Sequence, residues 1–237
     1  MREHSSLRTH TLRLIGCTLL ACTASLANAS LTVTSVVGGV ATGVKYVNFD
    51  NLNLGTAGGT SNGITVSVTG TAKVVQGSVA RQYAAPYISN SNAVLFGDNT
   101  VSGPDSTKYL STGHKGSITF EMPEPELYLG LLWGSVDPEN TLTFYDANGN
   151  NIGSITGTDI TSSANGDQGA QGTYYVNITS SQSFSKVVAT ANGQVFEMDN
   201  LAYNATVPVP VPEASTYAML LAGLGLLGVI SRRRKAA

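Results

Sequence analysis

The chain has 237 residues, and its charge is distributed unevenly along the sequence. Residues 30–213 hold six basic and fourteen acidic side chains, a formal charge of −8, while the other basic residues lie near the two ends. An acidic middle repels phosphate groups and anionic lipid, which argues against nucleic acid as a partner. The only two cysteines, Cys17 and Cys22, lie in an N-terminal apolar stretch, so a disulfide or a cysteine-based metal site in the middle is excluded.

The first 29 residues have the three parts of a secretory signal peptide. Three arginines precede an apolar run from Leu14 to Ala24, and the small residues Ala27 and Ala29 then form a cleavage signal. This order predicts that residues 1–29 are removed and that Ser30 is the first residue of the mature protein. One alternative stays open, because Leu19-Leu20-Ala21-Cys22 is similar to a lipobox in which Cys22 would be acylated.

Residues 30–206 are predicted to form one β domain, because short β-rich runs separated by turn residues recur along them. The run at 64–69 alternates apolar and polar residues, as a half-buried strand does, and 117–120 repeats the pattern. The nearly continuous apolar run 127–136 predicts a central strand buried on both faces. Further strands are expected at 186–191 and 195–203.

A hairpin is expected around Asn148-Gly149, between the runs at 141–145 and 152–155. Asn-Gly favours a type I′ turn, in which both residues have positive φ. The fold class that follows is all-β: a single antiparallel β-sandwich, jelly-roll-like, flanked by an N-terminal signal peptide and a C-terminal single membrane helix.

Residues suited to catalysis are sparse in the middle of the chain. His114 is the only histidine outside the first 29 residues and lies in a turn-like stretch, and there is no cysteine to act as a nucleophile. Glu121, Glu124 and Glu126 suggest the paired carboxylates of glycoside hydrolysis, but the intervening prolines favour a solvated acidic loop. Asp137 and Glu139 fit turn chemistry. The sequence therefore predicts a protein that is not an enzyme.

Two Asp-Asn pairs form the one candidate metal site. Asp50 and Asn51 follow an early strand, and Asp199 and Asn200 lie in the last one. If the first and last strands of the sandwich lie side by side, these side chains supply the mixed oxygen ligands that Ca²⁺ prefers. The alternative is that they cap strand ends. Exposed rings for stacking on sugars would come from Tyr83, Tyr87, Tyr174 or Tyr175, whereas Trp133 is expected in the core.

The C-terminal part begins with a Val/Pro spacer at residues 207–210, which is extended and semi-rigid because proline recurs at every second position. After Glu213, the run from Ala214 to Ile230 has no charge and is just long enough to cross a bilayer. The basic residues that follow it stop transfer and stay on the cytoplasmic side; they are Arg232, Arg233, Arg234 and Lys235.

Residues 211–237 resemble a PEP-CTERM sorting signal. The resemblance rests on the order of three features: the motif Val211-Pro212-Glu213-Ala214-Ser215, an apolar helix and a basic end. Ala214 replaces the second proline of the name-giving motif. The resemblance implies that exosortase, in the inner membrane, cuts near Pro212-Glu213 and releases an exported protein to the cell surface or the medium. A plain single-span membrane anchor is the alternative.

Four segments of the middle also resemble PEP-CTERM surface proteins, whose activity is undefined: 47–52, 131–137, 166–169 and 196–202. The function expected is a non-catalytic component of the surface or of the extracellular matrix, associated with biofilm and exopolysaccharide. The alternative is a carbohydrate-binding module or adhesin; a hydrolase ranks third. Exosortase is the expected processing partner, extracellular polysaccharide is a candidate partner although the sequence names no ligand, and calcium is the one cofactor to consider.

Overall fold

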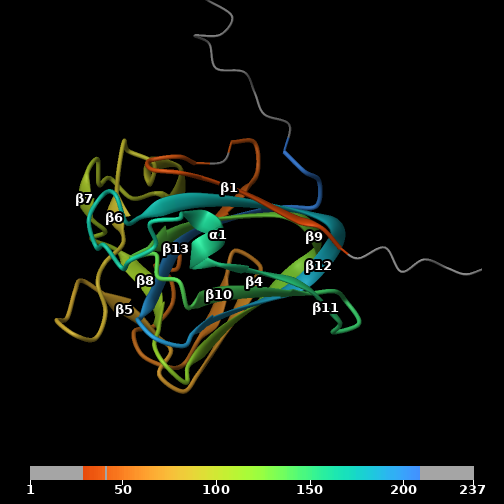
Figure 1. Cartoon of the computed structure of the whole chain (residues 1–237), viewed down its shortest axis with the longest axis horizontal. Helices are drawn as coiled ribbons and strands as arrows, with labels where there is room; N and C mark the ends of the chain where they lie inside the picture. Colours follow the sequence, from red (N-terminus) through yellow and green to blue (C-terminus); the bar gives the residue numbers. More distant parts are fainter. Residues whose placement is uncertain (1–28, 41, 209–237) are drawn as a thin grey trace, which may run out of the picture.

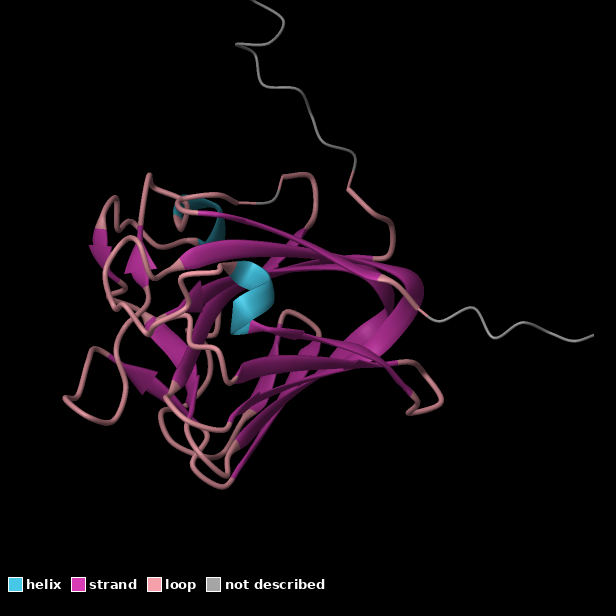
Figure 2. Ribbon diagram, in the orientation of Figure 1, coloured by secondary structure: helices cyan, strands magenta, loops and turns pink. Residues whose placement is uncertain are grey.

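The computed structural model describes residues 29–40 and 42–208, which form an almost wholly β domain (Figures 1 and 2). The predicted signal peptide, with Ala27, and the predicted sorting tail from Val211 to Lys235 lie outside the described residues. Within the described ranges, no helix is long and apolar enough to cross a membrane. The strands are β1 Leu31–Val36, β2 Lys45–Val47, β3 Gly59–Ser61, β4 Ile64–Thr69, β5 Lys73–Gln76, β6 Tyr87–Ile88, β7 Gly103–Pro104, β8 Lys108–Thr112, β9 Ser117–Gly134, β10 Asn140–Tyr145, β11 Asn151–Thr156, β12 Tyr174–Ala191 and β13 Phe196–Asn204; the helical turns are η1 Val94–Phe96 and α1 Gly157–Ile160.

Eleven strands belong to one antiparallel sheet, whose main path runs β11-β10-β12-β9-β13-β8-β5. β6 and β7 pair separately as a second sheet of two strands. The predicted antiparallel β fold is confirmed, but the eleven strands form one continuous hydrogen-bonded sheet. The reason is the length of β9 and β12, each of 18 residues, which curve around the core at the right of Figure 1. In each of these two strands, one half pairs with strands on one side of the core, and the other half pairs with strands on a different side.

The acidic stretch around Pro123 and Pro125 is part of β9, where the sequence favoured a loop. β4 pairs with Ser117–Glu121, and pairing with β12 resumes at Glu126. The prolines therefore occupy the part of the strand between these two ladders, where no backbone N–H is needed for pairing. Glu121 and Glu124 are exposed, whereas Glu126 is buried.

The second half of β9 is the central strand that the sequence predicted, buried on both faces. Leu129, Leu131 and Trp133 point into the main core, and Trp133 stacks on Phe196 with ring centroids 4.3 Å apart. Tyr128 and Leu132 point to the opposite face and pack against residues that include Ile88 and Phe96. Alternation along one strand thus feeds two apolar clusters.

Residues 77–107, which we call the covering segment, lie over that second face of the sheet. The segment contains only two short strands, β6 and β7, and the η1 turn. Its Ala85 packs with Tyr109 of β8. Its Pro86 lies so close to Gly134 of β9 that a Cβ added at Gly134 would be only 3.1 Å from the proline. The sequence of the covering segment has no regular periodicity from which this layer could be predicted.

The predicted hairpin is confirmed, since β10 and β11 pair through a turn at residues 146–150. The predicted type I′ turn is wrong, because Gly149 has positive φ (+81°) and Asn148 does not. The carboxylate of Asp146 explains the difference: its Oδ1 accepts the N–H groups of Asn148 and Asn150, each at 2.9 Å, and this organises a wider loop.

Candidate functional site

A cavity of about 700 Å³ opens between the covering segment, the C-terminal end of β9 and the start of β13. Its size falls in the range of small-molecule pockets. Four stretches of chain line it with mostly polar groups; the residues are Ser78–Ala84, then Ser135 and Asp137, then Asn165, Gly166 and Gln168, and finally Gln194, Val195 and Glu197. We call this cavity the polar pocket.

Glu197 is a buried carboxylate in the wall of the polar pocket, with 2% of its surface exposed. It lies on β13 opposite Gly134 of β9, so that Phe196 and Met198 face the core while Glu197 faces the covering segment. Oε1 accepts the Ala84 N–H at 2.9 Å, and Oε2 accepts the hydroxyl of Ser135. Burial raises the pKa of Glu197 to about 7 although both hydrogen bonds favour the charged form.

Asp137 is the second carboxylate of the polar pocket and lies three residues after the end of β9. Burial, with the nearby charge of Glu139, raises its pKa to about 6. The loop after α1 folds onto this position, because the Val136 carbonyl accepts the N–H groups of Asn165 and Gly166, each at 3.0 Å. A Cβ at Gly166 would lie 2.8 Å from Asp137 Oδ1, so a side chain there would collide with the carboxylate.

Three lining residues have left-handed backbone conformations: Arg81 with φ +63°, Ser135 with φ +41° and Gly166 with φ +71°. For the two residues other than glycine this conformation is strained, and such strain gathers at functional sites. The strain at Ser135 has a visible result, since this backbone aims the hydroxyl at Glu197. The pocket is therefore a built feature of the fold.

The rest of the wall offers groups that can hydrogen-bond a polar ligand. Gln168 and Gln194 carry amides, and Arg81 carries a guanidinium. Tyr83 adds an aromatic ring, packed edge-on against Tyr109 with centroids 6.4 Å apart and under the ammonium of Lys73 at 4.6 Å. Amides, carboxylates and a ring are the groups that recognise hydroxyl-rich ligands.

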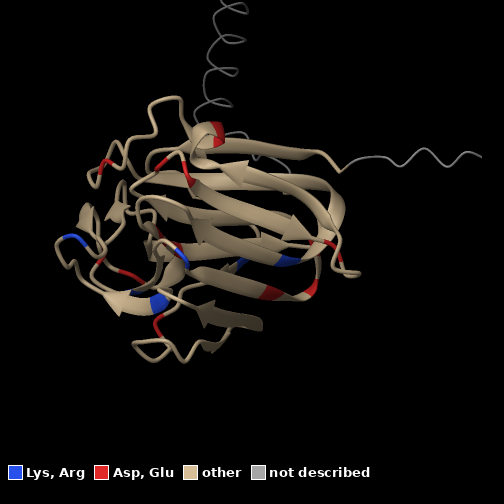
Figure 3. Cartoon of the chain, turned by 60° about the horizontal axis from the view of Figure 1, so that its bottom comes forward, with Lys and Arg blue, Asp and Glu red and all other residues tan. Residues whose placement is uncertain are grey.

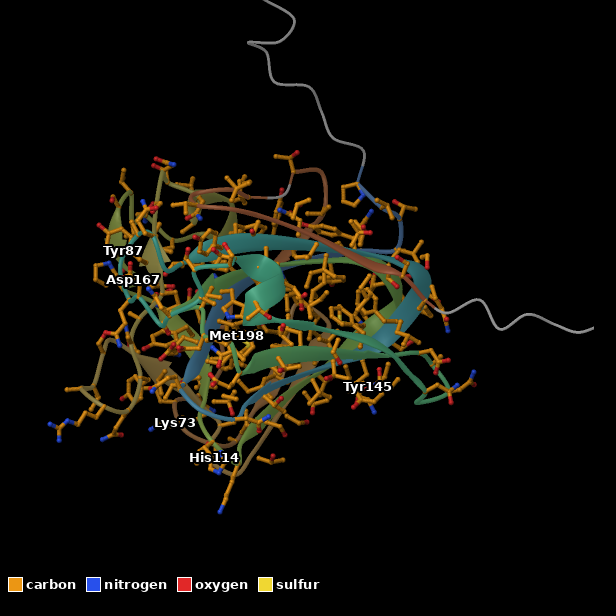
Figure 4. The ribbon with its side chains drawn as sticks, viewed as in Figure 1. Lys73, Tyr87, His114, Tyr145, Asp167 and Met198 are labelled. Atoms are coloured by element: carbon orange, nitrogen blue, oxygen red, sulfur yellow. The ribbon has the colours of Figure 1, made fainter. Side chains whose placement is uncertain are left out.

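The polar pocket was not predicted from the sequence, but one signal pointed toward it. Three of the four segments that resemble PEP-CTERM surface proteins contribute to its wall: 131–137 through Ser135 and Asp137, 166–169 through Gln168, and 196–202 through Glu197. These segments are far apart in the sequence. Figure 4 places Asp167, the neighbour of Gln168, at the same end of the molecule as Tyr87 of the covering segment, where the Tyr87 N–H donates to Thr173 Oγ1 at 3.2 Å.

The other sequence candidates lie elsewhere. His114 is exposed in a loop, as predicted, and Figure 4 shows it far from Asp167. Tyr174 and Tyr175 point to opposite faces of β12, one against the main core and one into the second cluster, as their consecutive positions predict. Charged side chains are few and scattered over the domain (Figure 3), and Glu121 and Glu124 lie outside the pocket lining.

The four residues of the predicted calcium site are only partly brought together. Asp50 lies close enough to Asp199 for their charges to repel, because β2 pairs with β13. Asn51 instead engages β3, donating to the Thr60 carbonyl at 2.8 Å and accepting from Ser61 at 2.6 Å. Asn200 has φ +50° at a bulge in β13. Within residues 29–40 and 42–208, no three His, Cys, Asp or Glu side chains are grouped as metal ligands.

The comparisons with known proteins concern the C-terminal part. The family description PEP-CTERM protein-sorting motif matches residues 210–235. The chain carries a PEP-CTERM protein-sorting motif. The motif confirms the resemblance read from Val211-Pro212-Glu213 and the basic end, and it implies exosortase-dependent export through a membrane intermediate to the cell surface. It covers the sorting tail and says nothing of the β domain.

Comparison with curated proteins gives no match. Among solved structures, a chain described as the enzymatically active domain of tailspike protein 4 from bacteriophage CBA120 is similar over 63% of this chain, at 16% identity and a TM-score of 0.25. The PEP-CTERM chain spans 21% of that structure's length. A TM-score this low carries no argument about the β domain.

Proposed function

We propose that this PEP-CTERM protein is an exosortase-processed component of the cell surface or extracellular matrix whose β domain holds extracellular polysaccharide in the polar pocket. The observation that carries the proposal is the pocket itself, about 700 Å³ in volume and lined by carboxylates, amides and a tyrosine. Polysaccharide is the abundant hydroxyl-rich material outside cells that bear exported proteins. Biofilm and exopolysaccharide are thus the setting in which we expect the protein to act.

The contacts of Glu197 favour binding over cleavage. Each of its oxygens already accepts a hydrogen bond, from Ala84 N–H and from the Ser135 hydroxyl, and the side chain is nearly inaccessible. A general acid must reach the glycosidic oxygen. A hydrolase is nevertheless the second candidate, because glycoside hydrolysis uses a pair of carboxyl groups, one of which is a general acid with a raised pKa, and the polar pocket holds two carboxyl groups.

Binding is tested with the full-length chain, purified in a mild detergent, on an oligosaccharide array and then by calorimetry on the best ligand. We expect Gln194→Ala and Gln168→Ala to weaken binding about tenfold each, the loss of one net hydrogen bond. Glu121→Gln, an exposed acidic position away from the pocket, is the control and should bind as the unaltered chain does. Absence of any glycan ligand, or equal binding by all four proteins, contradicts the proposal.

Cleavage is tested on the same ligands by release of new reducing ends. We expect none. If reducing ends appear, and Glu197→Gln and Asp137→Asn abolish them while Glu121→Gln does not, the protein is a hydrolase and the non-catalytic function is wrong.

Export is tested by intact mass spectrometry of the protein recovered from the cell surface. We expect a chain that begins at Ser30 and ends close to Glu213. Retention of Arg232 to Lys235 on surface material would favour a permanent anchor, and acylated Cys22 would establish a lipoprotein.

A further inference from the structure

A second group of acidic side chains lies under the covering segment and is separate from the polar pocket. Asp199, two residues beyond Glu197 on β13, has 1% of its surface exposed. Neither Asp199 oxygen accepts an N–H or a hydroxyl of the described residues in good hydrogen-bonding geometry. The Asn200 backbone N–H lies near enough to favour the charged form, whereas a hydrogen bond with the Asp105 carboxyl favours the protonated form of Asp199. A fully buried carboxylate without such partners is one of the least favourable groups that a protein can contain.

Asp105 of the covering segment lies directly against Asp199, so two carboxyl groups meet in the interior. One oxygen of Asp105 is fixed by Thr107, whose N–H and hydroxyl donate at 2.8 and 2.6 Å. The other oxygen, Oδ2, is buried without a hydrogen-bond partner in the described structure. Asp105 is itself only 2% exposed.

Asp98 repeats this arrangement. Its Oδ1 accepts the N–H and the hydroxyl of Thr100, both at 2.9 Å, while its buried Oδ2 has no partner among the described residues. Its charge repels that of Asp105. Two Asp-x-Thr turns thus hold one oxygen of each aspartate and leave the other oxygen free.

No basic side chain of the described structure neutralises this group. Lys108, three residues after Asp105, is engaged elsewhere, because its ammonium donates to the carbonyls of Asp50 and Leu52 at 2.6 and 2.8 Å. The single ion pair in the described part of the chain joins Lys45 to Glu124. The buried carboxylates therefore require a cation or a shared proton from elsewhere.

We propose that Asp105 and Asp199 bind a calcium ion that fastens the covering segment to β13. No three acidic side chains of the described residues are grouped as metal ligands. Ca²⁺ takes about six to eight hard oxygen ligands, so in this site the two aspartates supply the carboxylates, and carbonyl, hydroxyl and water oxygens have to complete the shell. A cavity of about 390 Å³ lined by Asp98, Ser106 and Thr107 brings solvent to the two Asp-x-Thr turns. Of the four ligands that the sequence predicted, Asp199 alone is kept, and Asp105 replaces Asp50, Asn51 and Asn200.

The proposal does not depend on the polar pocket being a sugar site, and its test reads calcium and stability alone. The full-length chain is melted in millimolar calcium and in EDTA. The protein is also dialysed, and the calcium that stays bound to it is measured by elemental mass spectrometry. We expect about one calcium per chain and a melting temperature higher by roughly 5–10 °C with calcium, as expected for a ligand at a hundredfold excess over Kd on a domain of this size. Identical melting curves and no bound calcium would overturn the proposal and leave a shared proton as the explanation.

Two substitutions separate a bound ion from a general charge effect. Asp199→Asn keeps the shape and removes the repulsion, so in EDTA the variant should melt at or above the temperature of the unaltered chain. The same variant should lose the calcium response, whereas Glu121→Gln, which removes an exposed charge, should keep it. Asp105→Asn serves if Asp199→Asn does not fold. A calcium response that survives both aspartate substitutions would show that the ion binds elsewhere, and the proposal would be wrong.

Discussion

The two faces of the sheet are covered by different chemistry. On the inner face, aromatic rings pack on one another: Trp133 stacks on Phe196, and Phe144 meets Phe184 edge to face at 5.1 Å. On the face under the covering segment, acidic side chains such as Glu197 are buried beside the apolar clusters. The inner face is therefore stabilised by loss of apolar surface from water, whereas the covered face also depends on protons, hydrogen bonds and, by our proposal, an ion.

The largest effect is expected from Trp133→Ala, which empties the centre of the inner face. Trp133 is fully buried, and loss of such a ring costs about 3–5 kcal/mol of unfolding free energy. Urea unfolding measures the loss. Val101→Ala in the covering segment is the matched control, because that side chain is 63% exposed and its removal should change stability little. If the two substitutions cost the same, apolar packing around Trp133 does not stabilise the inner face.

On the covered face, Ser135→Ala is expected to cost about 1–3 kcal/mol, because the buried carboxylate of Glu197 loses one of its two donors. Ser135→Gly removes the same hydroxyl but relieves the strain of φ +41°. We therefore expect the glycine variant to be the more stable of the two. Equal stability would mean that the backbone at residue 135 is not strained.

The contrast also explains which parts of the fold could be predicted from the sequence. β4 and β10 could be predicted because alternation of apolar and polar residues indicates a strand with one buried face. The second half of β9 could be predicted because a continuous apolar run indicates a strand that is buried on both faces. The covering segment has no such period. Its position depends on pairings such as Ala84 with Glu197, 113 residues apart, which local pattern does not encode.

The candidate site could not be predicted from the sequence for the same reason. Asp137 was taken for turn chemistry, and it does begin a turn, since its carbonyl accepts the Asn140 N–H at 3.2 Å. What the sequence could not show is that its carboxylate is covered by the loop at Gly166 and faces the same cavity as Glu197. For calcium, the first and last strands were supposed to lie side by side, whereas the first strand pairs with β12 and it is β2 that pairs with β13. Asp105 belongs to the unpatterned segment and was missed.

A smaller effect is expected at the tip of the β10–β11 hairpin, at the edge of the sheet. Gly149 has φ +81° in open space, so Gly149→Ala meets no neighbour and its cost is conformational, about 1 kcal/mol. Gly113→Ala is the control, because that glycine lacks a positive φ and an added Cβ would make ordinary contacts at 3.5 Å or more. Thermal melts of the two variants should differ; if they coincide, the turn has been assigned wrongly.

The smallest effect, and the sharpest contrast, is the pH dependence of two aspartates. The pKa of Asp137 is raised from 3.8 to about 6 by burial, so the folded state binds a proton more tightly than the unfolded state does. Its contribution to stability is complete below pH 4 and is lost as the pH rises to about 6. The pKa of Asp146 is lowered, chiefly by its hydrogen bonds from Asn150, so its contribution is present above pH 4 and is lost as the pH falls below that value. Solvent in the pocket and at the exposed hairpin screens both effects.

Urea unfolding from pH 3 to pH 7 measures these contributions as the free energy of unfolding against pH. Asp137→Asn should flatten that curve between pH 4 and 6, and Asp146→Asn should flatten it below pH 4. If Asp137→Asn leaves the upper limb unchanged, that carboxylate is solvated and the polar pocket is more open than the structure shows.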